Sequence, residues 1–186
     1  IGGAEYAVDL EGDDFSDFDV SMTFMPYTVP QMFNVTSVGQ GESLAWRLHK
    51  GGGVQLHNSL TIGFGHGMVL LDADPCDAWE LLLFGETLIA NNRFWDIGMN
   101  NAIDELISYE DGFVWNGTEV VQAHFIENGN LALNAEVDAE FTIENGFVLD
   151  PIDLTPTNMA FALDAEDYPS DGWFDPVGYI GAFEPD

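Results

Sequence analysis

Short β-rich runs separated by glycine are the feature that most narrows the folds open to this chain. Over residues 31–72 the runs read QMFNVTSVGQG, ESLAWRLHKGGG, VQLHNSLTIGFG and HGMVLLD. Their apolar residues fall at every second position, as in Leu44, Trp46 and Leu48, which is the periodicity of a β-strand. Such dense turns favour many short strands over a few long hairpins.

A recurrence within these runs favours one class of all-β fold. The segment FNVTSVG recurs as HNSLTIG, which sets Asn34 and Asn58 24 residues apart, within the range expected of solenoid repeats. A third copy, ANNRFWDIG, begins at Ala90 after an insertion. In a parallel β-helix these asparagines would stack, because each side-chain amide can donate to one neighbour and accept from the other. Chance recurrence of N-x-x-x-x-G in a glycine-rich chain is the alternative.

Two stretches interrupt this alternation of short β-rich runs and glycine turns. We interpret the whole chain, residues 1–186, as one β-helix domain. Residues 72–88 predict an inserted loop or short helix that Asp74 or Asp77 could cap, and residues 100–112 are also compatible with a helix, after which strands are expected to return over 113–129. Within the domain, residues 1–30 would be irregular or a first coil, 31–127 the coils, and 128–186 the last coil and an irregular capping tail.

The charge of the chain limits its partners. It carries 33 acidic and 3 basic residues, a net charge of -30. Nucleic acid is excluded as a partner, because phosphate contacts require Lys and Arg, and an anionic membrane surface is disfavoured for the same reason. Apolar residues make up 46% of the chain, enough for a packed core. No apolar run reaches the roughly 18 residues that a transmembrane helix needs.

Two segments carry a resemblance to a known family. The stretch NVTSVGQGESLAWRLHKGGGVQLHNSLTIGFGHGMVLLD resembles the coils of bacterial right-handed parallel β-helix repeat proteins, in which an "lR-x-x-x-Gg" coil precedes "xxNsxxxGf". The segment DGWFDPVGYIGAFEPD resembles the tail of surface and outer-membrane lipoproteins of this type. The residues that carry this second match are Trp173, Phe174, Val177, Tyr179, Gly181, Ala182 and Phe183.

The resemblance implies a fold and a location more than an activity. It covers roughly residues 30–100 and 145–186, and it implies a protein that is secreted, periplasmic or displayed on a bacterial cell surface. Most members of the family have no assigned function. Their tail continues into a W-x-x-GWT segment, whereas this chain stops at Asp186, so we expect it to be a fragment of a longer chain.

Calcium is the metal that the acidic clusters suit best. Asp72, Asp74 and Asp77 have a D-x-D-x-x-D spacing, and Ca²⁺ accepts six to eight oxygen ligands from irregular loops. Residues 13–19 hold a second group of aspartates. Neither group matches the EF-hand loop, so a solvated acidic surface is the simpler interpretation.

Other side chains allow weaker hypotheses. Trp79 and Trp115 lie beside turns, where exposed rings could bind a glycan, although packing in the core or a cap is the simpler role. The four histidines, His49, His57, His66 and His124, lack the tight spacing of zinc motifs. Cys76 is the single cysteine, and no basic residue lies near it in sequence to stabilise a thiolate.

These patterns favour a non-enzymatic structural or interaction role within a larger surface assembly of protein chains. A calcium- or glycan-binding module is the first alternative. A polysaccharide-active hydrolase or lyase is the second: Arg47 and Lys50, close to His49, could serve a lyase, and a pair of carboxylates could serve a hydrolase. With 33 acidic residues, some carboxylates will fall at a suitable distance by chance, so geometry must decide.

Overall fold

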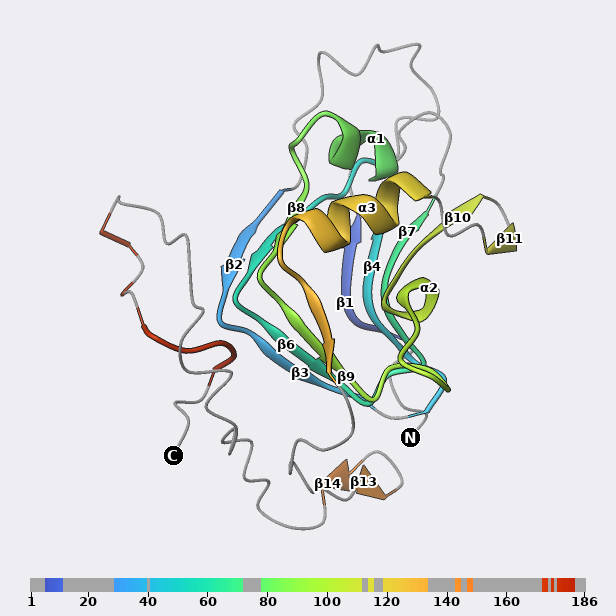
Figure 1. The fold of residues 1–186 in the computed structure, drawn as a ribbon, viewed down its shortest axis with the longest axis vertical. Helices are drawn as coiled ribbons and strands as arrows, with labels where there is room; N and C mark the ends of the chain where they lie inside the picture. The colour runs from blue at the N-terminus through green and yellow to red at the C-terminus, as the bar shows by residue number, and fades with distance from the viewer. Residues whose placement is uncertain are drawn as a thin grey trace.

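A computed structural model of the chain shows a mostly β protein with short helices (Figure 1). The helices are α1 (Ala78–Leu83), α2 (Ile103–Leu106) and α3 (Glu119–Glu127). The structure describes residues 6–11, 29–39, 41–71, 78–111, 114–115, 119–133, 143–144, 147–148, 172–173, 175 and 177–182.

Most strands belong to three parallel sheets, which we call the first, second and third sheet. The first consists of β2 (Gln31–Phe33), β5 (Gln55–His57) and β8 (Leu88–Ala90). The second consists of β3 (Thr36–Val38), β6 (Leu60–Ile62), β9 (Arg93–Trp95) and β12 (Leu131–Leu133). The third consists of β1 (Tyr6–Glu11), β4 (Leu44–His49), β7 (His66–Leu71) and β10 (Ile107–Asp111), with β11 (Val114–Trp115) antiparallel to β10. Separately, β13 (Ile143–Glu144) and β14 (Phe147–Val148) form an antiparallel pair.

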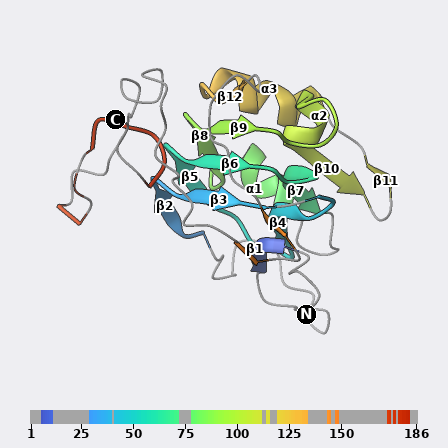
Figure 2. The same cartoon turned by 90° about the horizontal axis from the view of Figure 1, so that it is seen from below.

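The chain visits the three sheets in a fixed rotation. It runs through β2, β3 and β4, then β5, β6 and β7, then β8, β9 and β10, and each strand pairs with the strand one circuit earlier. Gln31 pairs with Gln55, 24 residues on, which confirms the sequence repeat. The next circuit is longer, 33 residues between Ser59 and Asn92, because it includes α1. Figure 2 shows the circuits stacked from β1 to β12.

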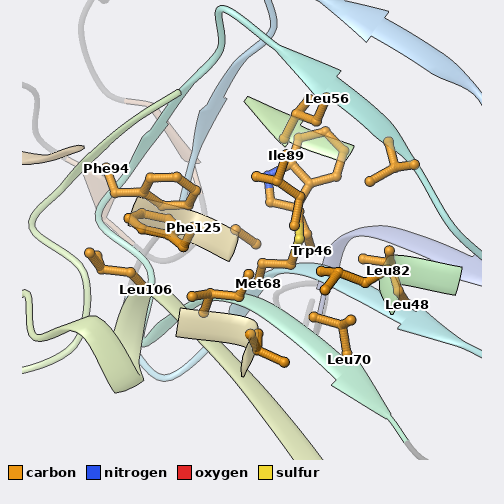
Figure 3. Close-up of a cluster of buried hydrophobic side chains, with 14 of the residues drawn as sticks. Trp46, Leu48, Leu56, Met68, Leu70, Leu82, Ile89, Phe94, Leu106 and Phe125 are labelled. Carbon is orange, nitrogen blue, oxygen red and sulfur yellow. The ribbon is translucent and has the colours of Figure 1, made fainter. Parts of the chain in front are cut away.

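The main core brings together buried side chains from all three parallel sheets and from the helices (Figure 3). Trp46 on β4 is 1% exposed, and its Nε1 donates a hydrogen bond to Thr61 Oγ1 on β6, 3.3 Å away, so the third sheet is tied to the second across the interior. On β9, Phe94 packs against Phe125 of α3 with ring centroids 5.1 Å apart. A small second cluster, with Leu60 and Ile62, lies apart from this core.

The helices both confirm and correct the sequence predictions. The short helix expected within residues 72–88 is present as α1, but only the first part of the 100–112 patch is helical, since β10 begins at Ile107. The expectation of strands over 113–129 is wrong for residues 119–127, which form α3. Val121 and Phe125, four residues apart, lie on one face of that helix and are buried. Burial of this face against the core overrides the β propensity of Val and Phe.

Helix α3 covers the end of the first sheet. The Ile89 N–H of β8 donates to His124 Nε2 at 3.4 Å, and Asn91 N–H donates to Asn128 O at 2.8 Å. The helix therefore takes the place that a fourth strand would occupy, which protects an otherwise open sheet edge. Within the described ranges, no helix is long and apolar enough to cross a membrane.

Candidate functional site

A column of asparagines forms the turn between the first and second sheets. Asn34, Asn58 and Asn91 have φ of 55°, 51° and 56°, the left-handed region that asparagine tolerates better than most residues. Asn91 Nδ2 donates to Asn58 Oδ1 at 2.8 Å. The equivalent placement of the three asparagines is thus confirmed, and the predicted side-chain hydrogen bond is confirmed between Asn91 and Asn58.

The next position along the later circuits forms a second, buried polar column of Ser59, Asn92 and Asn130, whereas Val35 takes this position in the circuit of Asn34. Asn92, 0% exposed, accepts the Ser59 N–H on Oδ1 at 2.8 Å and donates from Nδ2 to Leu56 O at 3.0 Å and to Asn130 Oδ1 at 2.9 Å. Asn130 donates in turn to Ile89 O at 2.7 Å. These amides satisfy backbone groups that would otherwise be buried without partners.

Residues 177–182, which we call the strap, lie against the outer face of the second sheet. Asn34 Nδ2 donates to Tyr179 O at 2.6 Å, Gly181 N–H to Asn58 O at 2.7 Å, and Ala182 N–H to Thr36 Oγ1 at 2.8 Å. Ile180 is fully buried. Three hydrogen bonds and one apolar anchor therefore join the strap to two successive circuits.

A cavity of about 610 Å³ opens where the second sheet turns into the third. Three glycines form its corner, because each circuit passes close to the next there: a Cβ on Gly65 would lie 2.8 Å from Gly41 O. The third glycine is Gly98, and the other residues that line the cavity are Glu42, Leu44, His66, Met99 and Glu105. Two carboxylates and one imidazole thus share a cavity, which makes it the candidate functional site.

The carboxylate of Glu105 accepts hydrogen bonds from backbone N–H groups. It accepts the N–H groups of Met99 at 3.0 Å, Asn100 at 3.0 Å and Ala102 at 2.9 Å. Desolvation raises the pKa of Glu105, but these hydrogen bonds and the nearby His66 outweigh it, so the pKa lies below its ordinary value. Glu105 is therefore a fixed negative charge at neutral pH.

His66 remains neutral beside that charge. Burial lowers the pKa of His66, and Glu105, Asp104 and Glu110 oppose the shift without cancelling it. A neutral imidazole can accept a proton, so the corner holds one possible base, and Glu42 is an exposed carboxylate next to it. In the part of the chain that the structure describes, no group of three His, Cys, Asp or Glu side chains is arranged to hold a metal ion.

The structure does not test the residues that the sequence predicts to bind a metal ion or a glycan. Asp72, Asp74 and Asp77 lie outside the described residues, as do Cys76 and the aspartates of residues 13–19. Trp79 lies in α1 and Trp115 in β11, and their side chains are outside the description. Calcium binding and glycan binding at these residues stay predictions. An unchanged melting temperature in millimolar calcium relative to EDTA, at constant ionic strength, would remove the calcium hypothesis.

The basic residues proposed for a lyase occupy the outer face of the third sheet. Arg47 Nη1 lies 3.4 Å from Asp9 Oδ2 and His49 Nε2 lies 3.0 Å from Asp9 Oδ1, so both side chains are drawn to one carboxylate. Lys50 takes φ of 50° in the turn after β4. Arg93, 3% exposed, has a structural role described below.

The structure also shows where the four histidines lie relative to the strands and helices. His49 and His57 end strands β4 and β5, and His66 begins β7, as expected for single histidines at strand ends. His57 stacks on Phe33, with ring centroids 4.7 Å apart. His124 departs from the expectation because it lies within α3.

Sequence reasoning missed the second polar column, the backbone hydrogen bonds of Glu105 and the contact of the strap with the second sheet. The doubled asparagine of ANNRF was the one local signal for Asn92, since the first of the pair belongs to the outer ladder. No protein-family model, curated protein or solved structure matches the chain.

Proposed function

We propose that this chain is a short right-handed parallel β-helix that serves as a structural and interaction module in an extracellular, cell-surface or periplasmic assembly. The rotation of the chain through three parallel sheets supports the β-helix, because each strand then lies directly on the strand one circuit earlier. A right-handed path is the expected one, since connections between parallel strands of one sheet are almost always right-handed.

The use of buried polar groups carries the structural half of the proposal. Ser59, Asn92 and Asn130 form a continuous hydrogen-bonded column across three circuits. Arg93 Nη1 donates to Asn91 Oδ1 at 3.2 Å, Asn92 O at 3.2 Å and Gly129 O at 3.1 Å. An enzyme would use such polar side chains to bind a substrate, whereas here they hydrogen bond mostly to backbone groups. Buried hydrogen bonds of this kind make the stacked circuits more rigid.

The charge supports the interaction half. A net charge of -30 keeps a chain of this size soluble and attracts cationic partners over a Debye length of about 8 Å at physiological ionic strength. The partners that fit are other protein chains with basic surfaces, while nucleic acid does not fit.

Carboxylate-directed crosslinking on cells that make the protein tests this role. A carbodiimide suits the chain, because it activates carboxylates and joins them directly to lysine amines of a basic partner, and this chain has 33 acidic residues and a single lysine, Lys50. We expect recurrent crosslinks from this chain to one or a few basic partner chains, weakened by added salt. Crosslinks confined within single copies of the chain would contradict an interaction module.

The corner cavity supports a second candidate function, hydrolysis of a polysaccharide. Glu42 and Glu105 line one cavity with a neutral His66, and glycosidases use two carboxylates about 5 to 10 Å apart. Release of reducing ends from acidic and neutral polysaccharides should be compared between wild type and Glu42→Gln, which removes an exposed carboxylate. Turnover by wild type that Glu42→Gln abolishes would establish the hydrolase and refute the non-enzymatic role.

A further inference from the structure

The strap occupies a binding seat that is separate from the main core. We define the seat by Asn34, Thr36, Asn58, Leu60 and Ile62. Leu60 and Ile62 alternate along β6 with Thr61, whose side chain meets Trp46 inside, so they project from the outer face. There they form a cluster with Ile180 that shares no member with the main core. The seat is thus built by the circuits alone, and the strap is added to it.

Shape and hydrogen bonding make the seat selective for a segment of this kind. Gly181 has φ of 88°, and a Cβ there would lie 2.9 Å from Thr36 Oγ1. The residue before it must be apolar and large enough to fill the space over Leu60, as Ile180 does. The seat therefore recognises a short, bent segment in which a large aliphatic residue is followed by glycine.

The strap also suits contact between two acidic chains. Residues 177–182 read VGYIGA and carry no charge at neutral pH, and the seat residues are uncharged as well. The strap follows Leu133, the last residue of β12, by about 40 residues, whose contour length is about 130 Å. That length is enough for the strap of one copy to reach the seat of another.

We propose that the seat is an intermolecular docking site and that its partner is residues 177–182 of a second copy of this chain. Within one chain the strap fills its own seat, and between chains the same contacts are exchanged, as in domain swapping. This inference rests on the proposed interaction role and adds a further partner to the basic chains, a second copy of this chain that binds through an uncharged surface. It involves neither the corner cavity nor polysaccharide turnover, so its failure and that of the proposed function are separable.

Peptide binding to the full chain tests the seat. A fluorescein-labelled peptide of residues 172–186 is titrated by anisotropy against wild type and against Ile180→Asp, in which the buried anchor of the strap is replaced by a charge. In wild type the attached strap competes at an effective concentration in the millimolar range. We expect the peptide to bind Ile180→Asp at least tenfold more tightly than wild type, and an Ile180→Asp peptide to bind neither chain.

Two controls keep the test specific. A Trp173→Ala peptide should bind as well as the unchanged peptide, because Trp173 is 84% exposed. Gly181→Val provides a second full chain with a displaced strap, since any side chain there is strained, and it should behave as Ile180→Asp does. Equal binding to wild type and both variants, or no binding to either variant, would overturn the proposal.

Complementation between two defective chains tests exchange between copies. Ile180→Asp keeps the seat and loses the strap anchor, whereas Leu60→Asp keeps the strap and loses the seat. Mixed at about 100 μM, the pair should form a heterodimer by size-exclusion chromatography with light scattering, while each variant alone stays monomeric. A mixture that stays monomeric while the peptide binds Ile180→Asp would refute exchange between copies.

Discussion

Replacement of Asn92 by alanine should destabilise the protein strongly, because its side chain is fully buried and hydrogen bonds to groups of two other circuits. The variant removes the acceptor of the Ser59 N–H, which is buried with its residue at 1% exposure. It also removes the donor to Leu56 O and one of the two donors to Asn130 Oδ1. Asn92 thus connects three circuits through one side chain.

The magnitude follows from the groups left behind. A buried N–H without an acceptor costs about 1–3 kcal/mol, and two acceptors that lose a donor add to this, so we expect a loss of about 3 kcal/mol in the free energy of unfolding. For a chain of 150–250 residues each kcal/mol lowers the melting temperature by about 2–4 °C. The melting temperature should therefore fall by about 6–12 °C.

Urea unfolding followed by circular dichroism, together with calorimetry, measures the change. Asn100→Ala is the matched control, because Asn100 is exposed and its truncation should stay within about 0.5 kcal/mol of wild type. A double-mutant cycle with Asn130→Ala should give a coupling of at least about 0.5 kcal/mol. If Asn92→Ala is no more destabilising than Asn100→Ala, the buried column does not hold the circuits together.

Further substitutions test the roles assigned to other side chains. Arg93→Met should cost about 2–4 kcal/mol in urea unfolding, because it removes one buried and two partly buried hydrogen bonds of a charged group. Arg47→Met should cost less than about 1 kcal/mol, since its ion pair is partly exposed. Equal losses would contradict the structural role of Arg93. Phe125→Ala should cost about 3–5 kcal/mol, whereas Ile126→Ala, at a residue 62% exposed, should have little effect; similar small losses would argue that α3 does not cap the core. Burial lowers the pKa of His124, and Glu127 only partly opposes this shift. The folded state therefore disfavours the protonated imidazole. The contribution of neutral His124 to stability is present above the unfolded pKa of about 6.5 and declines below it. The stability of wild type relative to His124→Gln should therefore fall between pH 7.5 and pH 5.5 in urea titrations, and a pH-independent difference would refute this assignment.

The sequence predicted those parts of the fold that repeat locally. Asn34 and Asn58 recur at a spacing that the strand pairing reproduces, and Asn91 continues their ladder despite the longer circuit. A left-handed turn restricts residue type so strongly that its position is visible in the letters alone. Strand periodicity likewise predicted a strand through Trp46 and Leu48, which lie in β4 and are both buried.

The parts that could not be predicted depend on contacts between distant residues. The apolar residues of 119–127 are spaced in a way that fits both a strand and a helix. The helix forms because Phe125 then packs against Phe94. Asn130 lies 38 residues from its partner Asn92, a spacing that no fixed period contains. The strap meets its seat across 145 residues, from Asn34 to Tyr179, and nothing local in the sequence encodes that contact.

Disulfide trapping along one column of the first sheet tests most directly whether successive circuits stack in parallel register. In a Cys76→Ser background, Gln31→Cys with Gln55→Cys joins adjacent strands, whose spacing of about 4.8 Å lies within the range that a disulfide spans. Gln31→Cys with Leu88→Cys places the thiols two strands apart, at about 9.6 Å, which is too far. We predict that mild oxidation crosslinks the first pair nearly completely and leaves the second pair reduced. Efficient crosslinking of the second pair, or none of the first, would contradict a stack of 24-residue and 33-residue circuits.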